Sequence, residues 1–428
     1  MLTFIIFLSS IGGWVALVSV LIHFFSPAGK CVKNMNVTKA VPSIESDLFL
    51  LNAAVASGAE LTYFNDEECE ILSDNRTWYL SLTKDVEHAT RSIYISTYIW
   101  EVDEVSGEFF AALVRAVKRD VEVRLLMDDF GNSLSKEVVQ KLKDGGIRVK
   151  RFRPLKLGKL SFYFSRNHRR SYIFDEEVAY IGGASVSKRW FVRPSRKFST
   201  YTDVMYRFSG SAVRQALTAF GELWTATGGE VLQFQTAEVL TKANQYHNAL
   251  FLNHAPRVDI HPYTYLIWYS CMVAKKSIVL CSPYMLPGEA MTQLLIQKAK
   301  AGVSVTLITQ GTNEIWFVAQ AGRSNYDQFL EAGITIYECH GDAHLHAKIS
   351  LIDDSWSMVG SANFDTRSQR INHESILGVQ SKPFAERNAK ILAGYISTAQ
   401  KIELNEWQRR PFYKKIVERS LNFFSEQM

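Results

Sequence analysis

The stretch His346-Ala-Lys-Ile-Ser-Leu-Ile-Asp353, followed after six residues by Gly360-Ser-Ala-Asn363, decides the fold of this 428-residue chain. A second copy, His168-Arg-Arg-Ser-Tyr-Ile-Phe-Asp175 with Gly182-Gly-Ala-Ser185, lies about 180 residues earlier. In both copies a strand-like run separates the cation from the aspartate. Because a long pattern recurs with the same internal spacing, the chain is predicted to contain two similar halves.

The segments that precede each copy also repeat in the same order. Each half has an alternating apolar run, a segment of helical spacing, a second alternating run and a glycine-containing turn. These elements fall at residues 92–96, 110–117, 121–125 and 141–147, and again at 277–281, 294–299, 303–307 and 329–334. Strands that alternate with helices predict an α/β layered unit with a largely parallel sheet in each half.

The N-terminus is the one strongly apolar segment. Residues 2–25 form a run of 24 residues without Lys, Arg, Asp or Glu, which is long enough to cross a bilayer as a helix. A cleaved signal peptide is the alternative, but its basic start and short apolar core are missing. Lys30, Lys33 and Lys39 follow the segment and none precedes it, which favours a cytoplasmic body. The predicted organisation is a transmembrane anchor at 1–29, a linker at 30–60 and two halves at 61–240 and 241–428.

Composition excludes a disordered or fibrous chain, since 47% of the residues are hydrophobic and 21% are charged. The net charge of +5 suits an anionic partner such as membrane lipid, and does not by itself indicate nucleic acid. The five cysteines are widely spaced and form no CxxC pair. Neither a zinc site nor a disulfide framework is predicted from them, and a reducing compartment is the simplest interpretation.

The repeated motif places chemical groups on one side of a strand. Residues two apart on a strand face the same way, so His346 projects with Lys348, and His168 with Arg170. One imidazole can attack phosphorus while the other protonates the leaving oxygen. The cations and the polar turn that follows can stabilise charge on the phosphate oxygens without a metal. The residue types therefore indicate a site for a phosphodiester.

The pattern HxKxxxxD with a downstream GSxN resembles the phospholipase D superfamily, in which two copies in one chain are the hallmark. Over about residues 75–428 the chain is similar to bacterial cardiolipin synthases, with supporting phrases at 98–100, 128–131, 166–168, 360–368, 372–374 and 405–410. The resemblance implies a phospholipase D-like pseudo-twofold pair of α/β/α sandwich halves sharing one site, behind one N-terminal transmembrane helix. Such enzymes often carry two hydrophobic segments, and this chain has one.

The same resemblance implies roles for individual residues. His168 would be the nucleophile that forms a phosphohistidine, and His346 would act as acid and then as base. Asp203 and Glu374 would orient the histidines. The phosphate would be held by motif cations and small-residue turns, namely Arg170, Lys348, Gly183, Ser185, Ser361 and Asn363. The motif aspartates Asp175 and Asp353 complete the catalytic pattern, in which they look more structural than chemical.

The first motif departs from the family pattern, since Arg170 stands where the family has Lys and Ser185 where it has Asn. Arg keeps the charge but is bulkier and planar, and Ser keeps a donor with shorter reach. A silent first half that scaffolds a partner is therefore the alternative to a working site. His340 and His344, close to His346, raise a metal cluster as a further alternative, although their spacing matches no zinc pattern.

The expected function is a membrane-anchored phosphatidyltransferase that makes cardiolipin and glycerol from two molecules of phosphatidylglycerol. The expected partners are this lipid and the bilayer, with no nucleic acid, cofactor or metal, and the oligomeric state is left open. The expected location is the cell (inner) membrane, with one span and a cytoplasmic body. A phospholipase D-type hydrolase of phospholipid or nucleic acid, and a catalytically silent membrane scaffold, remain the alternatives.

Overall fold

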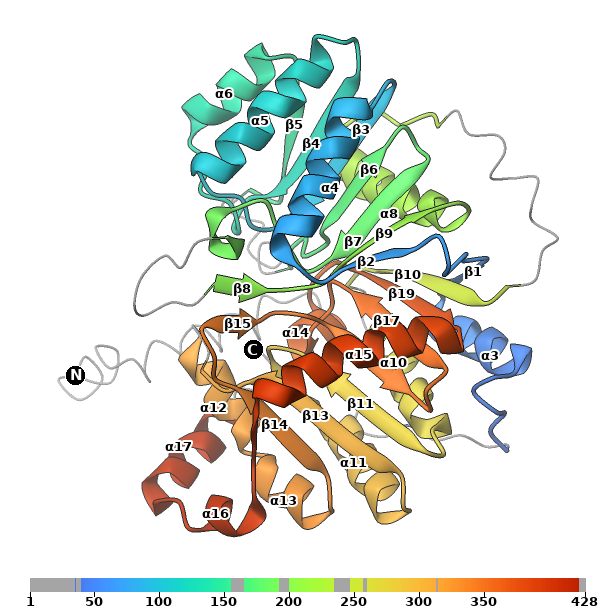
Figure 1. The fold of residues 1–428 in the computed structure, drawn as a ribbon, viewed down its shortest axis with the longest axis vertical. Helices are drawn as coiled ribbons and strands as arrows, with labels where there is room; N and C mark the ends of the chain where they lie inside the picture. Colours follow the sequence, from blue (N-terminus) through green and yellow to red (C-terminus); the bar gives the residue numbers. More distant parts are fainter. Residues whose placement is uncertain are drawn as a thin grey trace.

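The computed structural model describes residue 35 and residues 40–154, 165–191, 200–234, 247–256, 260–312 and 315–422. The anchor predicted at residues 1–29 lies outside these ranges. Within them, no helix combines the length and the apolar character needed to cross a membrane. The described chain forms two layered α/β halves, one above the other in Figure 1.

The first half is built on a seven-stranded sheet with helices on both faces. The strand order is β2 (Glu70–Leu72), β9 (Met205–Ser209), β7 (Val178–Gly182), β6 (Ser171–Phe174), β3 (Ser92–Thr97), β4 (Glu122–Asp128) and β5 (Arg148–Phe152). The helices α4 (Asn75–His88), α5 (Glu104–Val117) and α6 (Lys136–Asp144) pack on one face, and α8 (Ala212–Ala226) packs on the other. Asp74, Asp103 and Ser135 cap the first three helices by accepting hydrogen bonds from first-turn amides, which pairs donors that would otherwise be orphaned.

The second half repeats this plan on a nine-stranded sheet. The strand order is β1 (Glu60–Thr62), β10 (Ala249–His254), β19 (Glu374–Gln380), β17 (Trp356–Gly360), β16 (Ile349–Ile352), β11 (Ser277–Cys281), β13 (Ser304–Gln310), β14 (Thr335–Cys339) and β20 (Gln400–Lys401). The helices α10 (Pro262–Val273), α11 (Glu289–Lys300) and α13 (Tyr326–Glu331) pack on one face, and α15 (Lys382–Thr398) packs on the face toward the first half. Shorter elements are η1 (Lys188–Trp190), β12 (Met285–Leu286), α12 (Trp316–Arg323), β18 (Phe364–Asp365), α14 (Thr366–Arg370), α16 (Leu404–Gln408) and α17 (Phe412–Asn422).

Both large sheets are mixed, which corrects the expectation of largely parallel sheets. Within them, parallel pairing is confined to β3–β4–β5 and β11–β13–β14. The strands β6 and β7, and likewise β16 and β17, follow one another in sequence and pair antiparallel. The motif aspartate begins the turn between them with positive φ, 51° at Asp175 and 50° at Asp353. A reversal this short leaves no room for the crossover that parallel strands require.

The segment expected as a linker contains ordered structure. Helix α3 (Asp47–Ser57) packs on the second half, where Phe49 lies edge-on to Trp356 with ring centroids 5.1 Å apart. The following strand β1 pairs antiparallel with β10. The chain therefore contributes to the sheet of the second half before it enters the first half. This pairing covers the edge of β10 that would otherwise present unpaired amides and carbonyls.

The two halves are joined by strand pairing as well as by a shared core. Strand β8 (Thr200–Thr202) of the first half pairs in parallel with β15 (Ala343–Leu345) of the second. On the opposite side of the interface, Asn167 forms a parallel bridge with His373. One apolar cluster also contains side chains of α8 and α15 and of both large sheets. The ends of the two motifs are therefore held at the interface between the halves.

Candidate active site

The interface pairings place each motif histidine beside an acid from the other half. Leu345 is paired with Thr202, and one residue further along both strands come His346 and Asp203. The second bridge joins Asn167 to His373, and the next residues are His168 and Glu374. The backbone supports both registers, since the amide of His346 donates to the Thr202 carbonyl at 2.8 Å and that of His168 to the His373 carbonyl at 3.0 Å.

The carboxylates contact the histidines at Nδ1. Glu374 Oε1 lies 2.8 Å from Nδ1 of His168, and Asp203 Oδ2 lies 2.5 Å from Nδ1 of His346. The two acids occupy equivalent places in their halves. Asp203 lies two residues before Met205, which pairs with Gly182. Glu374 lies two residues before Ile376, which pairs with Gly360. The sequence indicated both acids, whereas the exchange between halves is visible only in the structure. An acid held at Nδ1 fixes the tautomer that leaves a lone pair on Nε2.

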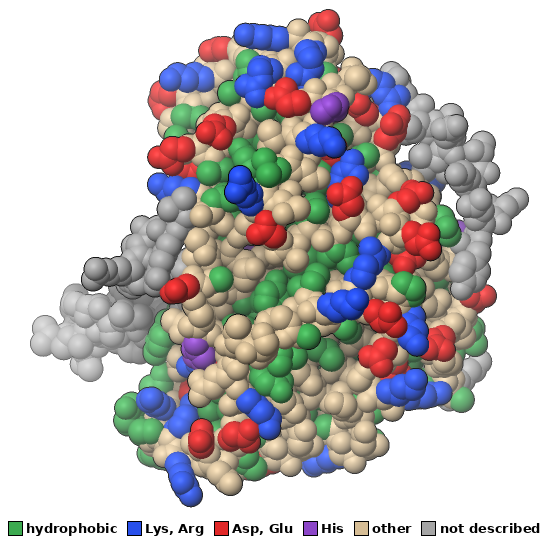
Figure 2. Space-filling model, viewed as in Figure 1, with side chains coloured by type: hydrophobic (Ala, Val, Ile, Leu, Met, Phe, Trp, Pro, Cys, Tyr) green, Lys and Arg blue, Asp and Glu red, His purple; other side chains and the backbone are tan. Residues whose placement is uncertain are grey.

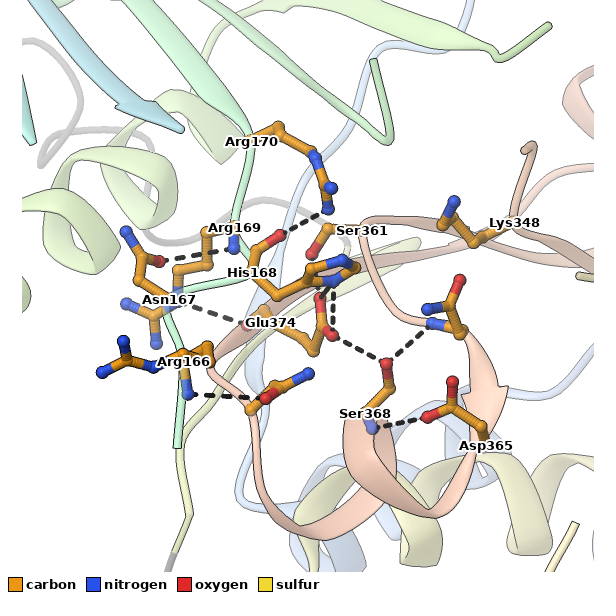
Figure 3. A network of polar contacts seen from close by, with 12 residues as sticks. Arg166, Asn167, His168, Arg169, Arg170, Lys348, Ser361, Asp365, Ser368 and Glu374 are labelled. Carbon is orange, nitrogen blue, oxygen red and sulfur yellow. Dashed lines mark hydrogen bonds and ion pairs between the residues drawn. The ribbon is translucent and has the colours of Figure 1, made fainter. Parts of the chain in front are cut away.

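Small residues that follow β17 and β7 contact these acids. Ser361 donates to Glu374 Oε2 at 2.5 Å, and Ser368 donates to Oε1 at 2.7 Å (Figure 3). Gly183 is the counterpart of Ser361, and a Cβ added there would lie 2.4 Å from Asp203 Oδ2. Ser361 and Gly183 were expected to bind phosphate, but they do not line the cavity and instead contact the acids.

The two motif cations make equivalent contacts with their own strands. Arg170 Nη1 donates to the carbonyl of His168 at 2.9 Å, and Lys348 Nζ donates to the carbonyl of His346. Lys348 Nζ also lies 2.8 Å from His346 Nδ1 and 4.0 Å from Asp203 Oδ2. The Arg that replaces Lys in the first motif is therefore accommodated at the equivalent position.

Both histidines open on one cavity of about 250 Å³ at the interface. Arg170 lines it, whereas Lys348 contacts His346 and does not line the cavity. The amide oxygen of Asn363 is buried and has no hydrogen-bond partner among the described residues, so the side chain can turn a polar group toward a ligand. The remaining lining residues include Tyr98, Ile99, Arg166, Arg189, Tyr201, Tyr284, Ile315, Val318, Asp365, Arg367 and Asn372.

Burial controls the charges in this site. It lowers the pKa of His168 and of His346, and the neighbouring cations Arg170 and Lys348 lower both pKa values further. Burial also raises the pKa of Glu374 to about 7 and lowers the pKa of Lys348 to about 7. Near neutral pH the two imidazoles are therefore neutral, and one of them can act as a nucleophile.

The motif aspartates have structural contacts. Asp353 accepts hydrogen bonds from the amides of Lys275, Lys276 and Ser277 at 2.7, 2.7 and 2.9 Å, where β11 begins. Asp175 accepts the equivalent bonds from residues 90–92, where β3 begins. Neither aspartate lines the cavity. They tie the hairpin of each motif to the neighbouring strand.

The remaining predicted residues divide between the site and its surroundings. Ser185 is fully buried behind Arg170, whose Nε lies 3.4 Å from its hydroxyl. His340 contacts Glu338 at 3.1 Å, and His344 packs against Tyr201. Within the described ranges, no group of three or more His, Cys, Asp or Glu side chains is arranged to hold a metal ion.

Sequence reasoning assigned no role to several residues that surround the histidines. Ser368 holds Glu374, and its position follows from Asp365, which caps α14 by accepting the amide of Ser368 at 2.7 Å. The spacing of Asp365 and Ser368 signals such a cap but not the contact with Glu374. Tyr98 and Arg367 reach the cavity from separate elements, and no local pattern marks them as neighbours.

The chain is similar in sequence to known proteins. The chain matches the family model described as "Cardiolipin synthase, PLD-like domain" over residues 82–224 and 271–395. It is 29% identical over 373 residues to cardiolipin synthase A of Wigglesworthia glossinidia brevipalpis, covering 84% of this chain and 74% of that protein. It is 27% identical over 368 residues to cardiolipin synthase 1 of Bacillus cereus, covering 83% and 72%.

A solved structure shares the fold. The phosphatidylserine synthase of Haemophilus influenzae Rd KW20 superimposes with a TM-score of 0.68 at 13% identity, covering 89% of this chain and all of the other. The family match includes the two motifs and both halves of the interface site. This protein therefore belongs to the cardiolipin synthase family of phospholipase D-like proteins and is a transferase of the phospholipase D superfamily.

Proposed function

We propose that this protein makes cardiolipin and glycerol from two molecules of phosphatidylglycerol, through a phosphohistidine intermediate. The observation that carries the proposal is a pair of imidazoles on one cavity, each held at Nδ1 by an acid from the opposite half. The names of the relatives support the choice of product. The proposal includes the membrane anchor at residues 1–29, with the catalytic body on the cytoplasmic side.

In the first step, Nε2 of His168 attacks the phosphorus of one phosphatidylglycerol. The bond from phosphorus to the headgroup glycerol oxygen breaks, and that oxygen takes a proton from Nε2 of His346. Glycerol leaves, and the phosphatidyl group remains on His168 through a P–N bond.

In the second step, a glycerol hydroxyl of another phosphatidylglycerol gives its proton to His346 and attacks the same phosphorus. The P–N bond breaks, cardiolipin leaves, and His168 and His346 return to their starting states. Water in place of the second lipid would give phosphatidic acid, which is the hydrolase alternative.

The substrate itself supplies a charge that the chemistry needs. Burial and Lys348 lower the pKa of His346, so this imidazole is a poor proton donor before substrate binds. A phosphodiester brings a negative charge close to both imidazoles, which favours the protonated form. Arg170 and the amide of Asn363 are placed to share the charge of the phosphate oxygens.

The test uses the full chain reconstituted in vesicles with phosphatidylglycerol labelled on phosphorus. Cardiolipin with an equal amount of glycerol is the expected result, and His168→Ala and His346→Ala should abolish both. His344→Ala is the matched control, because this neighbouring histidine does not line the cavity. Phosphatidic acid alone would replace the proposal with a hydrolase, and absence of any turnover by the unaltered protein would leave a scaffold.

The covalent intermediate and the orientation have separate tests. Quenching in alkali should preserve phosphorus label on the protein, and acid should release it, since a P–N bond is stable to base and labile to acid. His168→Ala should carry no label, whereas label retained by His168→Ala would reassign the nucleophile. Cys31 is the second residue after the anchor, so a membrane-impermeant thiol reagent should modify it only after the cytoplasmic side is exposed.

A further inference from the structure

An apolar surface with flanking cations lies on α12 and α17. On α17, Phe412, Tyr413 and Ile416 are 74%, 64% and 48% exposed. Trp316, at the start of the adjoining α12, is 54% exposed. We call these four residues the apolar face. In the space-filling view, hydrophobic and cationic side chains lie together at the lower left edge, over α17 (Figure 2).

The part of the apolar face on α17 is the outer side of an amphipathic helix. Phe412 and Ile416 are four residues apart and share one side of α17. The opposite side faces the protein, where Glu418 is buried in an ion pair with Arg410 at 2.6 Å and Leu421 packs on an apolar cluster. The contacts that fix α17 to the body thus use Glu418 and Leu421, and its most apolar side is directed outward.

The accessible charges on α17 itself are positive, whereas the exposed acids Glu403 and Glu406 lie on the preceding segment and line the cavity that contains Trp316 and Tyr413. Between residues 409 and 421 the acidic residue is Glu418, which is buried against Arg410. The cations Arg409, Lys414, Lys415 and Arg419 lie on the accessible surface of the same segment. Aromatic side chains with neighbouring Lys and Arg are the combination that binds the interface of an anionic bilayer.

Helix α12 connects this face with the catalytic cavity. Ile315 directly precedes Trp316, and both Ile315 and Val318 line the cavity that contains His168 and His346. Trp316 and Tyr413 line a second cavity, of about 620 Å³. The second cavity is lined largely by charged and polar side chains, so the apolar connection between the outer face and the catalytic wall is made by Trp316, Ile315 and Val318.

We infer that the apolar face of α12 and α17 lies on an anionic phospholipid bilayer and admits lipid to the catalytic cavity beside it. The inference rests on the proposed function, because it names the surface through which a diacyl substrate enters. Acyl chains leaving the bilayer would stay in contact with Trp316, Ile315 and Val318 while the headgroup reaches the histidines. The energetic advantage is that the chains are not exposed to water on the way.

Depth-sensitive labelling tests the orientation without using activity. In a Cys31→Ser background, Cys69, Cys271, Cys281 and Cys339 are buried, so a fluorophore can be attached selectively to Ile416→Cys. The matched control is Val55→Cys, a position that is 76% exposed. It belongs to α3, the helix at the opposite edge of the molecule from α17 in Figure 1. Full-length protein is placed in phosphatidylglycerol–phosphatidylcholine vesicles that contain a quenching lipid.

Quenching at position 416 should be at least twofold stronger than at position 55, and should weaken in vesicles of phosphatidylcholine alone. Equal quenching at both positions, or none at 416, would overturn the inference. Emission at 416 that is already blue-shifted in detergent and insensitive to quenching lipid would also overturn it, because another part of the protein would then cover the face.

Kinetics separates docking from chemistry. Phe412→Ser with Ile416→Ser should raise the KM for vesicle phosphatidylglycerol about tenfold and leave turnover of a monomeric short-chain phosphatidylglycerol unchanged. Leu48→Ser with Leu51→Ser on α3 is the matched control and should leave both values unchanged. An equal loss of activity on the vesicle and the short-chain substrate would contradict docking. Failure of the proposed function would look different, because no variant would turn over either substrate while the quenching result would stay the same.

Discussion

Glu374 of the second half lies 2.8 Å from Nδ1 of His168 in the first half, while Ser361 and Ser368 of its own half donate to its two oxygens. Asp203 makes the reciprocal contact with His346 at 2.5 Å. Each histidine therefore depends on the opposite half for its tautomer. Neither half alone contains a complete histidine–carboxylate pair, which gives a physical reason why both repeats must fold against one another.

Replacing Glu374 by Gln should remove most activity without unfolding the protein. The Gln amide can donate to Nδ1, which would shift the imidazole proton to Nε2 and block attack on phosphorus. A loss of about 10³- to 10⁴-fold in kcat is expected, by analogy with loss of the orienting acid in serine proteases. Glu222→Gln is the control, since Glu222 pairs with Arg169 of the same motif at 3.3 Å. Unaltered kcat in Glu374→Gln would remove the orienting role.

Replacing Gly183 by Ala should disturb the contact between Asp203 and His346 through a steric clash. The added Cβ would lie 2.4 Å from Asp203 Oδ2, so the carboxylate must move away from His346. We expect at least a tenfold fall in kcat, because the orientation of His346 is lost. The control is Gly107→Ala on α5, where nothing lies within 4 Å of the added atom. Equal activity of the two variants would mean that Asp203 tolerates displacement.

The activity of the unaltered protein should follow a bell-shaped pH profile centred near 7. Ionisation of Glu374, whose pKa burial raises to about 7, gives the rising acid limb because the carboxylate must accept Nδ1–H. Deprotonation of Lys348, whose pKa burial lowers to about 7, gives the falling alkaline limb because the site loses one of the two positive motif charges that attract the phosphodiester.

The variant Lys348→Arg assigns the alkaline limb. Arg remains charged throughout this range, and the equivalent position in the first motif already holds Arg170. We expect the alkaline limb to move upward by more than one pH unit, while the acid limb stays in place. An alkaline limb that does not move would assign it to another group.

Replacing Asp353 by Ala should lower stability more than catalysis. Three backbone amides at the start of β11 would lose their acceptor, at a cost of about 1–3 kcal/mol for each that stays buried and unpaired. A clear fall in Tm with kcat of the folded protein unchanged is expected, and Asp175→Ala should behave similarly. A selective loss of kcat at unchanged Tm would instead give Asp353 a chemical role.

The repeat, its elements and the residue types of the site were open to prediction from the sequence. Local pattern carries this information, because alternation and helical spacing reflect which side of an element is buried. The mixed character of the sheets was not predicted, since the pairing direction of β6 and β7 depends on a turn at Asp175 rather than on apolar spacing. The role of residues 47–62 was missed for a related reason, because their partner β10 lies far away in sequence.

The sequence by itself placed His168 and His346 in two copies of one motif with the same internal spacing, and the resemblance to the phospholipase D superfamily pointed to Asp203 and Glu374. Only the tertiary structure decided that the acids exchange partners, because that contact depends on the parallel register of β8 with β15 and of Asn167 with His373. Such registers join residues separated by more than a hundred positions, and they are set by packing of whole layers that no local pattern records.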